Sequence, residues 1–296
     1  MILYKIRFKL LSPLITPLKG DTIWGHIVWG IANNEGEKAV EEFLQEEKRS
    51  PHLIVSSAFP SDFICKPYLV PNERTKELNL EEYARIKQNK KIKYVKASNY
   101  LESADSDTDD CKDTEKEKHS FVSEIRMHNT IDRYSNTVIE GNLFTETELW
   151  PKPQYFDIYV LSSFTAERVY QLCTWAFENG YGADASVGKG RIKIMGKPEE
   201  VRIKNKGSAY LALGPFVLDD LDRITDLRAD VFLRTGKLGG GNLISENPHK
   251  KSVLLYDEGA VFISSEPISY IGHLLKDVHS DKRICQAAFA PVIPID

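Results

Sequence analysis

A glycine-rich stretch at 180–191, GYGADASVGKGR, holds the residues whose types and spacing most suggest chemistry. Two kinds of nucleotide-binding loop are excluded. A dinucleotide-binding loop has its glycines between a strand and the following helix, but here a predicted helix precedes the glycines and a strand follows them. A P-loop has Ser or Thr after its lysine, whereas Gly190 follows Lys189.

The glycine-rich stretch instead predicts a flexible loop whose exposed backbone N–H groups and basic side chains approach a phosphodiester backbone. The residues expected to make these contacts are Gly188, Lys189, Gly190 and Arg191. A long helix-to-strand turn, in which the glycines only supply positive φ, is the structural alternative.

A second cluster, MHNTIDRY at 127–134, places five different functional groups close together. They are the imidazole of His128, the amide of Asn129, the hydroxyl of Thr130, the guanidinium of Arg133 and the phenol of Tyr134. Such groups hydrogen-bond to phosphates, riboses or base edges, and an imidazole or a phenol can stack on a base. A hydrogen-bonded turn is the structural alternative.

Two further clusters are less specific. Lys19 and Trp24 lie at the start of a predicted helix, where a glycine can present N–H groups to a phosphate. His26 lies on the same helix and could act as a general acid/base, although the sequence identifies no partner for it. Near the C-terminus a triple glycine has basic residues on both sides, namely Arg234, Lys237, Lys250 and Lys251. This pattern suits a mobile loop that contacts phosphates or a protein, or a simple surface turn.

Hydrophobic periodicity predicts the elements that must position these clusters. Alternation of apolar and basic residues predicts a strand at 2–10, and we expect further strands at 53–59, 155–161, 191–195 and 209–213, with extended arms at 121–133 and 135–148. A period of 3.6 predicts helices at 37–47, 80–86 and 165–178, and one that starts after a cap at Asp21 or Thr22. The order of these elements matches the ferredoxin-like βαββαβ pattern. We expect an α+β fold with a first domain at 1–198, carrying an insertion at about 72–150, and a strand-rich second domain at 199–296.

The formal net charge of −4 is unevenly distributed along the chain. The segment 102–118 holds eight acidic and three basic residues, a net charge of −5, which leaves about +1 for the rest. Because this segment has no large apolar residue, it is predicted to be a disordered loop. Basic residues gather at the glycine-rich loops, so the negative total does not exclude a nucleic-acid partner.

Several classes of protein are excluded by composition. No apolar run approaches the ~20 residues that cross a bilayer, and the first residues lack the order of a signal peptide. The cysteines, Cys65, Cys111, Cys173 and Cys285, lie far apart without the spacing of a zinc site. We expect a reduced, cytoplasmic protein with no membrane partner, no metal and no other cofactor.

Several stretches together resemble the RAMP superfamily of CRISPR-associated proteins, most closely the fourth Csm subunits of type III-A effector complexes. They lie, in the family's order, at 12–31, 53–67, 128–133, 180–194, 234–242 and 247–262. The resemblance implies two ferredoxin-like (RRM-like) domains and a non-catalytic subunit that holds the repeat-derived 5′ handle of the crRNA. It also implies docking onto the large polymerase-like subunit and a backbone RAMP subunit. The implied RNA contacts are His128, Asn129, Thr130, Arg133, Lys189 and Arg191, followed by Lys19, Trp24, Arg234, Lys237, Lys250 and Lys251.

An enzyme is the alternative, because some RAMP proteins cleave repeat RNA with a histidine near the first helix, the place that His26 occupies. Metal-independent cleavage needs a base for the 2′-OH and an acid for the leaving oxygen. His26 could supply one of these groups, and the other would be His128, Tyr134 or Lys189. A protein-binding scaffold that does not contact RNA is a third hypothesis.

Overall fold

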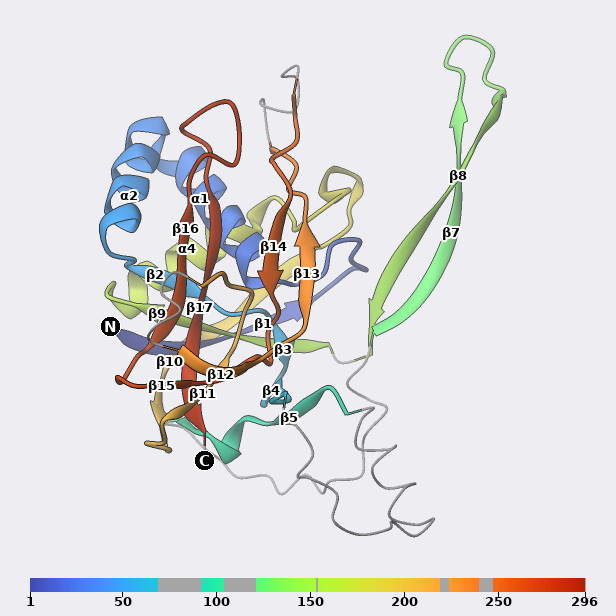
Figure 1. Cartoon of the computed structure of the whole chain (residues 1–296). Helices are drawn as coiled ribbons and strands as arrows, with labels where there is room; N and C mark the ends of the chain where they lie inside the picture. Colours follow the sequence, from blue (N-terminus) through green and yellow to red (C-terminus); the bar gives the residue numbers. More distant parts are fainter. Residues whose placement is uncertain (69–91, 104–120, 153, 219–223, 240–246, 296) are drawn as a thin grey trace, which may run out of the picture.

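The computed structural model describes residues 1–68, 92–103, 121–152, 154–218, 224–239 and 247–295. Two main sheets and the α-helices form the body, and a long β-hairpin projects from it (Figure 1). Within the described ranges, no helix is both long and apolar enough to span a membrane.

The first sheet is built from residues 2–203 and has the strand order β2-β9-β1-β10-β6, with antiparallel neighbours. Its elements, with the helices between them, are β1 (Ile2–Leu10), α1 (Gly20–Glu35), α2 (Glu37–Arg49), β2 (Leu53–Val55), β6 (Leu101–Ser103), β9 (Tyr155–Ser162), α4 (Ala166–Glu178) and β10 (Ile192–Ile203). Short strands lie beside it: β3 (Phe59–Pro60), β4 (Phe63–Cys65) and β5 (Tyr94–Lys96), with the 3-10 turn η1 (Ala97–Asn99). The succession β1-α1-β2-β9-α4-β10 follows the βαββαβ order predicted for the first unit, with α2 added.

The helices α1 and α4 cover one face of this sheet, and each presents an apolar stripe to it. Ile23, Ile27 and Ile31 recur along α1 at helical spacing and are buried. Gly30 lets the two helices approach closely, because a Cβ at this position would lie 2.8 Å from the Cβ of Trp175. The opposite face of the sheet carries alternating basic residues of β1.

The second sheet is built from residues 209–295 and has the order β12-β15-β11-β17-β16. The elements of this part are β11 (Ala209–Ala212), β12 (Ile224–Arg228), β13 (Val231–Arg234), β14 (Val253–Tyr256), β15 (Val261–Ser264), β16 (Tyr270–Leu275) and β17 (Gln286–Ile295). The described residues of 204–295 contain no helix, so they do not show the second βαββαβ unit that the family resemblance implies. β10 also runs through the domain boundary expected at 198.

The strand β17 joins the two parts of the chain into one core. It is buried along nearly its whole length and contacts α1, β2 and β9. Trp24 of α1 packs edge-on against Phe289 of β17, with ring centroids 5.7 Å apart. A single group of buried apolar side chains therefore extends across both sheets.

The start of α1 differs from the prediction. Lys19 is its N-cap residue and makes no side-chain capping bond, while Asp21 lies in the first turn. The Asp21 carboxylate pairs instead with Arg234 of β13. The predicted cap is wrong because a tertiary ion pair recruits this side chain.

The projecting hairpin consists of β7 (Phe121–Ile131) and β8 (Val138–Pro151), the two arms expected from the sequence. Leu14 and Leu149 exchange backbone N–H···O bonds of 3.0 and 2.7 Å and so tie its base to the body. Glu102 and Ser103 belong to β6, so the predicted acidic loop would begin two residues later than expected. The remainder of that loop, 104–118, and the helix predicted at 80–86 lie outside the described residues.

Candidate nucleic-acid interface

The glycine-rich loop at 180–190 is closed upon itself and held against the segment before α1. The N–H of Tyr181 donates to the carbonyl of Gly190, and the N–H of Gly190 donates to the carbonyl of Pro13, both at 2.9 Å. Gly190 has a φ of +62°, and a Cβ there would lie 2.0 Å from the Tyr181 carbonyl oxygen. The loop therefore requires glycine at 190 for close backbone approach, and its ends are fixed by hydrogen bonds.

Two side chains before and within α1 hold the middle of this loop. The N–H of Gly182 donates to Nε2 of His26 at 3.1 Å, and the N–H of Ala183 donates to Oγ1 of Thr16 at 2.9 Å. The Tyr181 ring lies 4.8 Å from the His26 ring, centroid to centroid. These backbone N–H groups donate to acceptors within the protein. The tip of the loop at 184–186 and the adjoining basic side chains remain to face a ligand.

The contact with Gly182 requires a neutral His26, because Nε2 must accept a hydrogen bond. Burial lowers the pKa of His26 to about 4, since the surrounding protein disfavours the charged imidazole. The sequence is compatible with His26 as a general acid/base, but its Nε2, which faces the loop, already accepts the hydrogen bond from Gly182. The geometry thus favours a role in holding the loop.

A pH prediction follows for His26. We expect the stability advantage of the wild type over the His26→Phe variant to be largest above pH 6.5. It should shrink by about 1–2 kcal/mol by pH 5, because the unfolded histidine takes up a proton there and the folded one, with a pKa of about 4, largely does not. Urea unfolding of both proteins from pH 8 to pH 5 measures this difference. An advantage that is the same at both ends of the range would contradict the assignment.

Glu148 joins the glycine-rich loop to the hairpin. This buried carboxylate of β8 is ion-paired with Lys189 and accepts from Nε of Arg126 at 2.8 Å and from Nε1 of Trp150 at 3.1 Å. Burial alone would raise the pKa of Glu148, but Lys189 and Arg126 hold it below its usual value. The guanidinium of Arg126 also lies 5.6 Å from the Trp150 ring centroid and is half-exposed. Lys189, predicted as a phosphate contact, therefore mainly fixes the loop beside the hairpin.

The hairpin carries the cluster predicted at 128–133 on its distal half. The ring of His128 stacks on Phe144 of the opposing strand, with centroids 5.3 Å apart and planes at 16°. Asn129, Thr130 and Arg133 are exposed. At the tip, the N–H of Tyr134 donates to Asp132 at 2.7 Å, so the predicted turn also forms. Asn129, Thr130 and Arg133 face solvent, whereas Nε2 of His128 is buried beside Glu146, 3.8 Å away.

Lys19 and Trp24, the candidates at the start of α1, have structural contacts. Nζ of Lys19 lies 2.6 Å from Asp257 and 2.7 Å from Glu258, which links the start of α1 to the turn between β14 and β15. Burial raises the pKa of Glu258 to about 7. Nε1 of Trp24 donates to the carbonyl of Leu53 at 3.1 Å inside the core. We therefore leave Lys19 and Trp24 out of the interface.

Of the four basic residues near the C-terminus, two have partners within the protein and two are exposed. Arg234 is paired with Asp21, with Nε and Oδ2 2.7 Å apart. Nζ of Lys250 donates to the carbonyl of Cys285 at 2.7 Å, and burial lowers the pKa of Lys250. Lys237 and Lys251 are exposed. Only the last two therefore present their charge to a partner.

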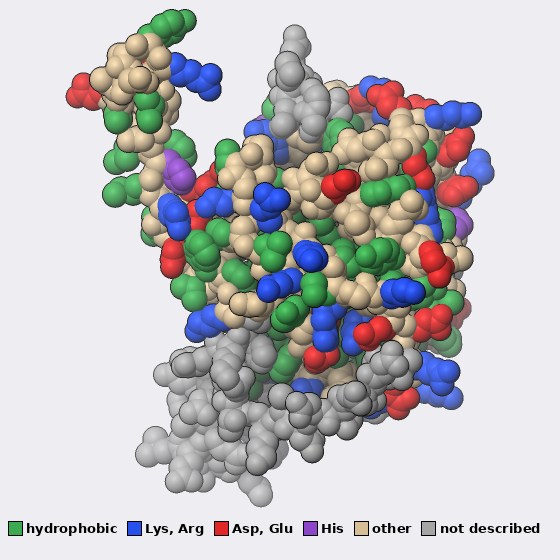
Figure 2. Space-filling model, turned by 180° about the vertical axis from the view of Figure 1, so that it is seen from behind, with side chains coloured by type: hydrophobic (Ala, Val, Ile, Leu, Met, Phe, Trp, Pro, Cys, Tyr) green, Lys and Arg blue, Asp and Glu red, His purple; other side chains and the backbone are tan. Residues whose placement is uncertain are grey.

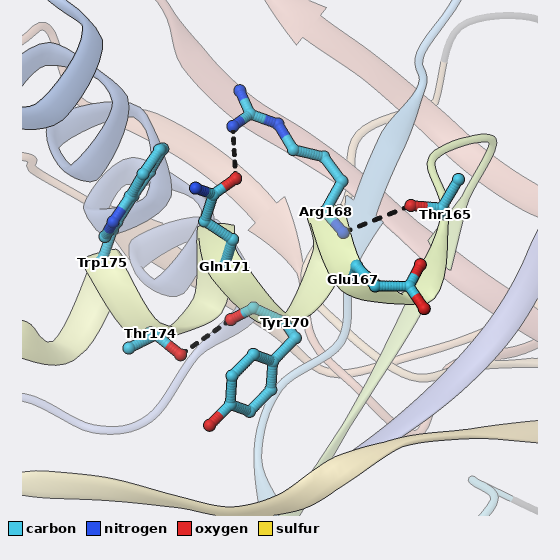
Figure 3. Close-up of a pocket in the computed structure, with 7 residues that line it drawn as sticks. All are labelled: Thr165, Glu167, Arg168, Tyr170, Gln171, Thr174 and Trp175. Carbon is cyan, nitrogen blue, oxygen red and sulfur yellow. Dashed lines mark hydrogen bonds between the residues drawn. The ribbon is translucent and has the colours of Figure 1, made fainter.

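A shallow pocket of about 560 Å³ lies along the outer side of α4 (Figure 3). It is lined by Thr165, Glu167, Arg168, Tyr170, Gln171, Thr174 and Trp175. Arg168 donates to Gln171 and to Glu35, and Thr174 donates to the carbonyl of Tyr170. These polar groups hydrogen-bond to one another. The pocket contains none of the predicted site residues. Among the described residues, no three His, Cys, Asp or Glu side chains could jointly hold a metal ion.

Comparison with known proteins identifies the fold. No protein-family model and no curated protein matches the sequence. One chain of a Csm1–Csm4 cassette in complex with AMPPNP is 14% identical, with a TM-score of 0.60 over 99% of this chain and 98% of that chain. One chain of a Csm3–Csm4 subcomplex of the type III-A CRISPR-Cas interference complex is 12% identical, with a TM-score of 0.57 over the full length of both. The resemblance inferred from the motifs is thus confirmed at the level of the fold.

Proposed function

We propose that this chain is a Csm4-like subunit of a type III-A CRISPR effector complex and binds the 5′ handle of the crRNA without cleaving it. The observation that carries the proposal is the ion cluster at Glu148. It holds the glycine-rich loop beside the hairpin, so that two segments far apart in sequence form one surface. The shared fold with chains of Csm complexes supports the same assignment.

The exposed groups of this surface suit single-stranded RNA. The half-exposed His128, backed by Phe144, offers a flat ring on which a base can stack, and Asn129 and Thr130 offer hydrogen bonds to base edges or riboses. Arg133 at the tip and Arg191 after the loop have no ion-pair partner within the described residues and can meet phosphates. Recognition of this kind grips the RNA and leaves the choice of target to base pairing by the guide.

The partners follow from the same assignment. The solved chains that share this fold come from assemblies with Csm1 and with Csm3. We propose that this chain likewise docks onto a large polymerase-like subunit and a backbone RAMP subunit. Co-purification from cells expressing the whole complex, with and without this chain, tests the docking.

We expect the double variant Asn129→Ala/Arg133→Ala to load at least about tenfold less handle RNA, because a hydrogen bond to a charged group is worth about 1.5–3 kcal/mol. The slope of log affinity against log salt should also fall by about 1 for the lost arginine. Filter binding of a handle RNA at three salt concentrations, and crRNA content of the purified complex, measure both effects. The control is Lys38→Ala, which removes a 90% exposed charge on α2. Normal crRNA loading by the double variant would support the protein-only scaffold instead.

The absence of cleavage is part of the proposal. His26, the residue that the sequence offered as general acid/base, has its Nε2 in a hydrogen bond with Gly182 and a pKa lowered to about 4 by burial. Incubating the purified protein with repeat RNA in EDTA tests this directly. Cleavage that disappears in the His26→Ala variant would establish a metal-independent endoribonuclease and overturn the proposal.

A further inference from the structure

The open face of the first sheet, opposite α1 and α4, is divided into a neutralised half and a half with uncompensated charge. In the neutralised half, Lys5 lies 2.8 Å from Glu199, and Arg7 lies 2.9 Å from Asp157 and 2.7 Å from Asp62. Every cation that β1 places here therefore has a carboxylate partner. This half needs no external anion.

The second half of the same face has cations without such partners. Lys9 of β1 lies directly opposite Lys193 of β10, and Arg191 lies on the same face two residues before Lys193. None of the three has an ion pair with a described residue. Like charges directly across a strand pair destabilise a sheet, so this arrangement is costly until an anion covers it.

An aromatic ring completes this half of the face. Tyr155 of β9 is 40% exposed and lies opposite Lys9 on the other side of β1. Nζ of Lys9 is 5.7 Å from the centroid of its ring. We use the name open strip for the four residues Lys9, Tyr155, Arg191 and Lys193.

The open strip is continuous with the surface described above. Arg191 follows the last glycine of the glycine-rich loop, and the N–H of Leu11 donates to its carbonyl at 2.8 Å. Tyr155 follows the end of β8 by four residues, and the N–H of Leu10 donates to the carbonyl of Gln154 at 3.0 Å. Lys and Arg side chains gather on the body next to the base of the hairpin (Figure 2). A single RNA strand held by the hairpin and the glycine-rich loop can therefore continue onto the open strip.

We propose that the open strip binds an unpaired stretch of the same RNA, with one base stacked on Tyr155 and the phosphates beside it held by Lys9, Lys193 and Arg191. This inference rests on the proposed function. Alternate residues of a strand lie about 7 Å apart, so Arg191 and Lys193 can hold separate phosphates. An exposed ring between cations is the combination that holds single strands with little preference for sequence. An acidic protein surface could pair with the three cations but would have no need of the exposed Tyr155 ring.

The test compares a handle RNA with the same RNA extended by about ten unpaired nucleotides, a length within the range of single-strand sites. We expect the wild type to bind the extended RNA more tightly. Tyr155→Ala should lose about tenfold in affinity for the extended RNA, as expected for one lost base stack, while Tyr155→Phe keeps it. Lys9→Gln/Lys193→Gln should lower the salt slope by about 2. Lys38→Gln, which removes one exposed positive charge on α2, is the control.

The outcomes separate the two proposals. Failure of the wild type to bind the handle RNA at all would overturn the proposed function. Normal handle binding, with Tyr155→Ala and the double lysine variant binding the extended RNA like the wild type, would overturn the open strip alone. Variants that bind RNA normally but lose a partner subunit would show that the strip is a protein contact and also overturn it. Urea unfolding checks that the fold of each variant is intact. The Tyr155 variants should unfold close to the wild type, and the double lysine variant should be slightly more stable, because the repulsion between Lys9 and Lys193 is removed.

Discussion

Replacing Gly190 with alanine should lower the free energy of unfolding by about 3–5 kcal/mol, through overpacking and a left-handed backbone. The added Cβ would lie 2.0 Å from the Tyr181 carbonyl oxygen, and that oxygen cannot move away without breaking its own loop. The Gly190 N–H bond to Pro13 would be displaced at the same time. The same variant should lose RNA binding, because the loop leaves the side of the hairpin.

Gly188→Ala is the matched control for this prediction. Gly188 also has a positive φ, +95°, but an added Cβ there meets no atom within 4 Å. Only the backbone preference is lost, which costs about 1–2 kcal/mol. Urea unfolding of the two variants measures the difference. Equal losses would mean that the close approach at 190 relaxes freely and that the loop is not fixed as described.

Replacing Arg234 with alanine should cost about 3–5 kcal/mol of stability, the usual loss when one partner of a buried ion pair is removed. The Asp21 carboxylate is 1% exposed and would keep only Gln286, whose Nε2 lies 3.2 Å away. An unpaired buried carboxylate is expensive because little solvent reaches it. Thermal or urea unfolding at pH 7 measures this loss.

Arg228→Ala provides the comparison for Arg234→Ala. Arg228 also pairs with an aspartate, Asp226, at 2.7 Å, but the two side chains are 35% and 49% exposed. Removing an exposed pair should cost less than about 1 kcal/mol. The variant Arg234→Met/Asp21→Leu should recover part of the stability, because it removes both buried charges. Loss of RNA binding by Arg234→Ala with unchanged stability would instead support the phosphate contact expected from sequence.

The strands and helices of the first sheet could be predicted because the local spacing of their apolar residues indicates each of them. Tyr4, Ile6 and Phe8 alternate with charged residues along β1, and they are buried as the alternation requires. The hairpin arms and the glycine-rich turn were also visible locally. Of the second sheet only β11 was predicted as a strand, because most of its other strands are short and several of its neighbours in space are far apart in the chain.

Whether a basic residue is ion-paired within the protein or available to a ligand could not be predicted from the sequence. A lysine beside glycines has the same local pattern whether its partner is a phosphate or a distant carboxylate. Lys189 is paired with Glu148, 41 residues away, and Lys19 with Asp257, 238 residues away. In contrast, the exposed cluster at 128–133 was found because its groups adjoin in the chain. Glu148 and Trp150 were missed because only the pairing of β7 with β8 brings them to Arg126.

The position of β17 in the core also sets the order in which the protein can fold during its synthesis. Side chains of α1 contact residues of β17, which is made much later, as in the bond between Asp21 and Gln286 across 265 residues. Contacts so distant in sequence form slowly because a long loop must close first. The emerging chain therefore exposes Trp24 and its neighbours until β17 has been made. Apolar surface that stays exposed during folding favours aggregation.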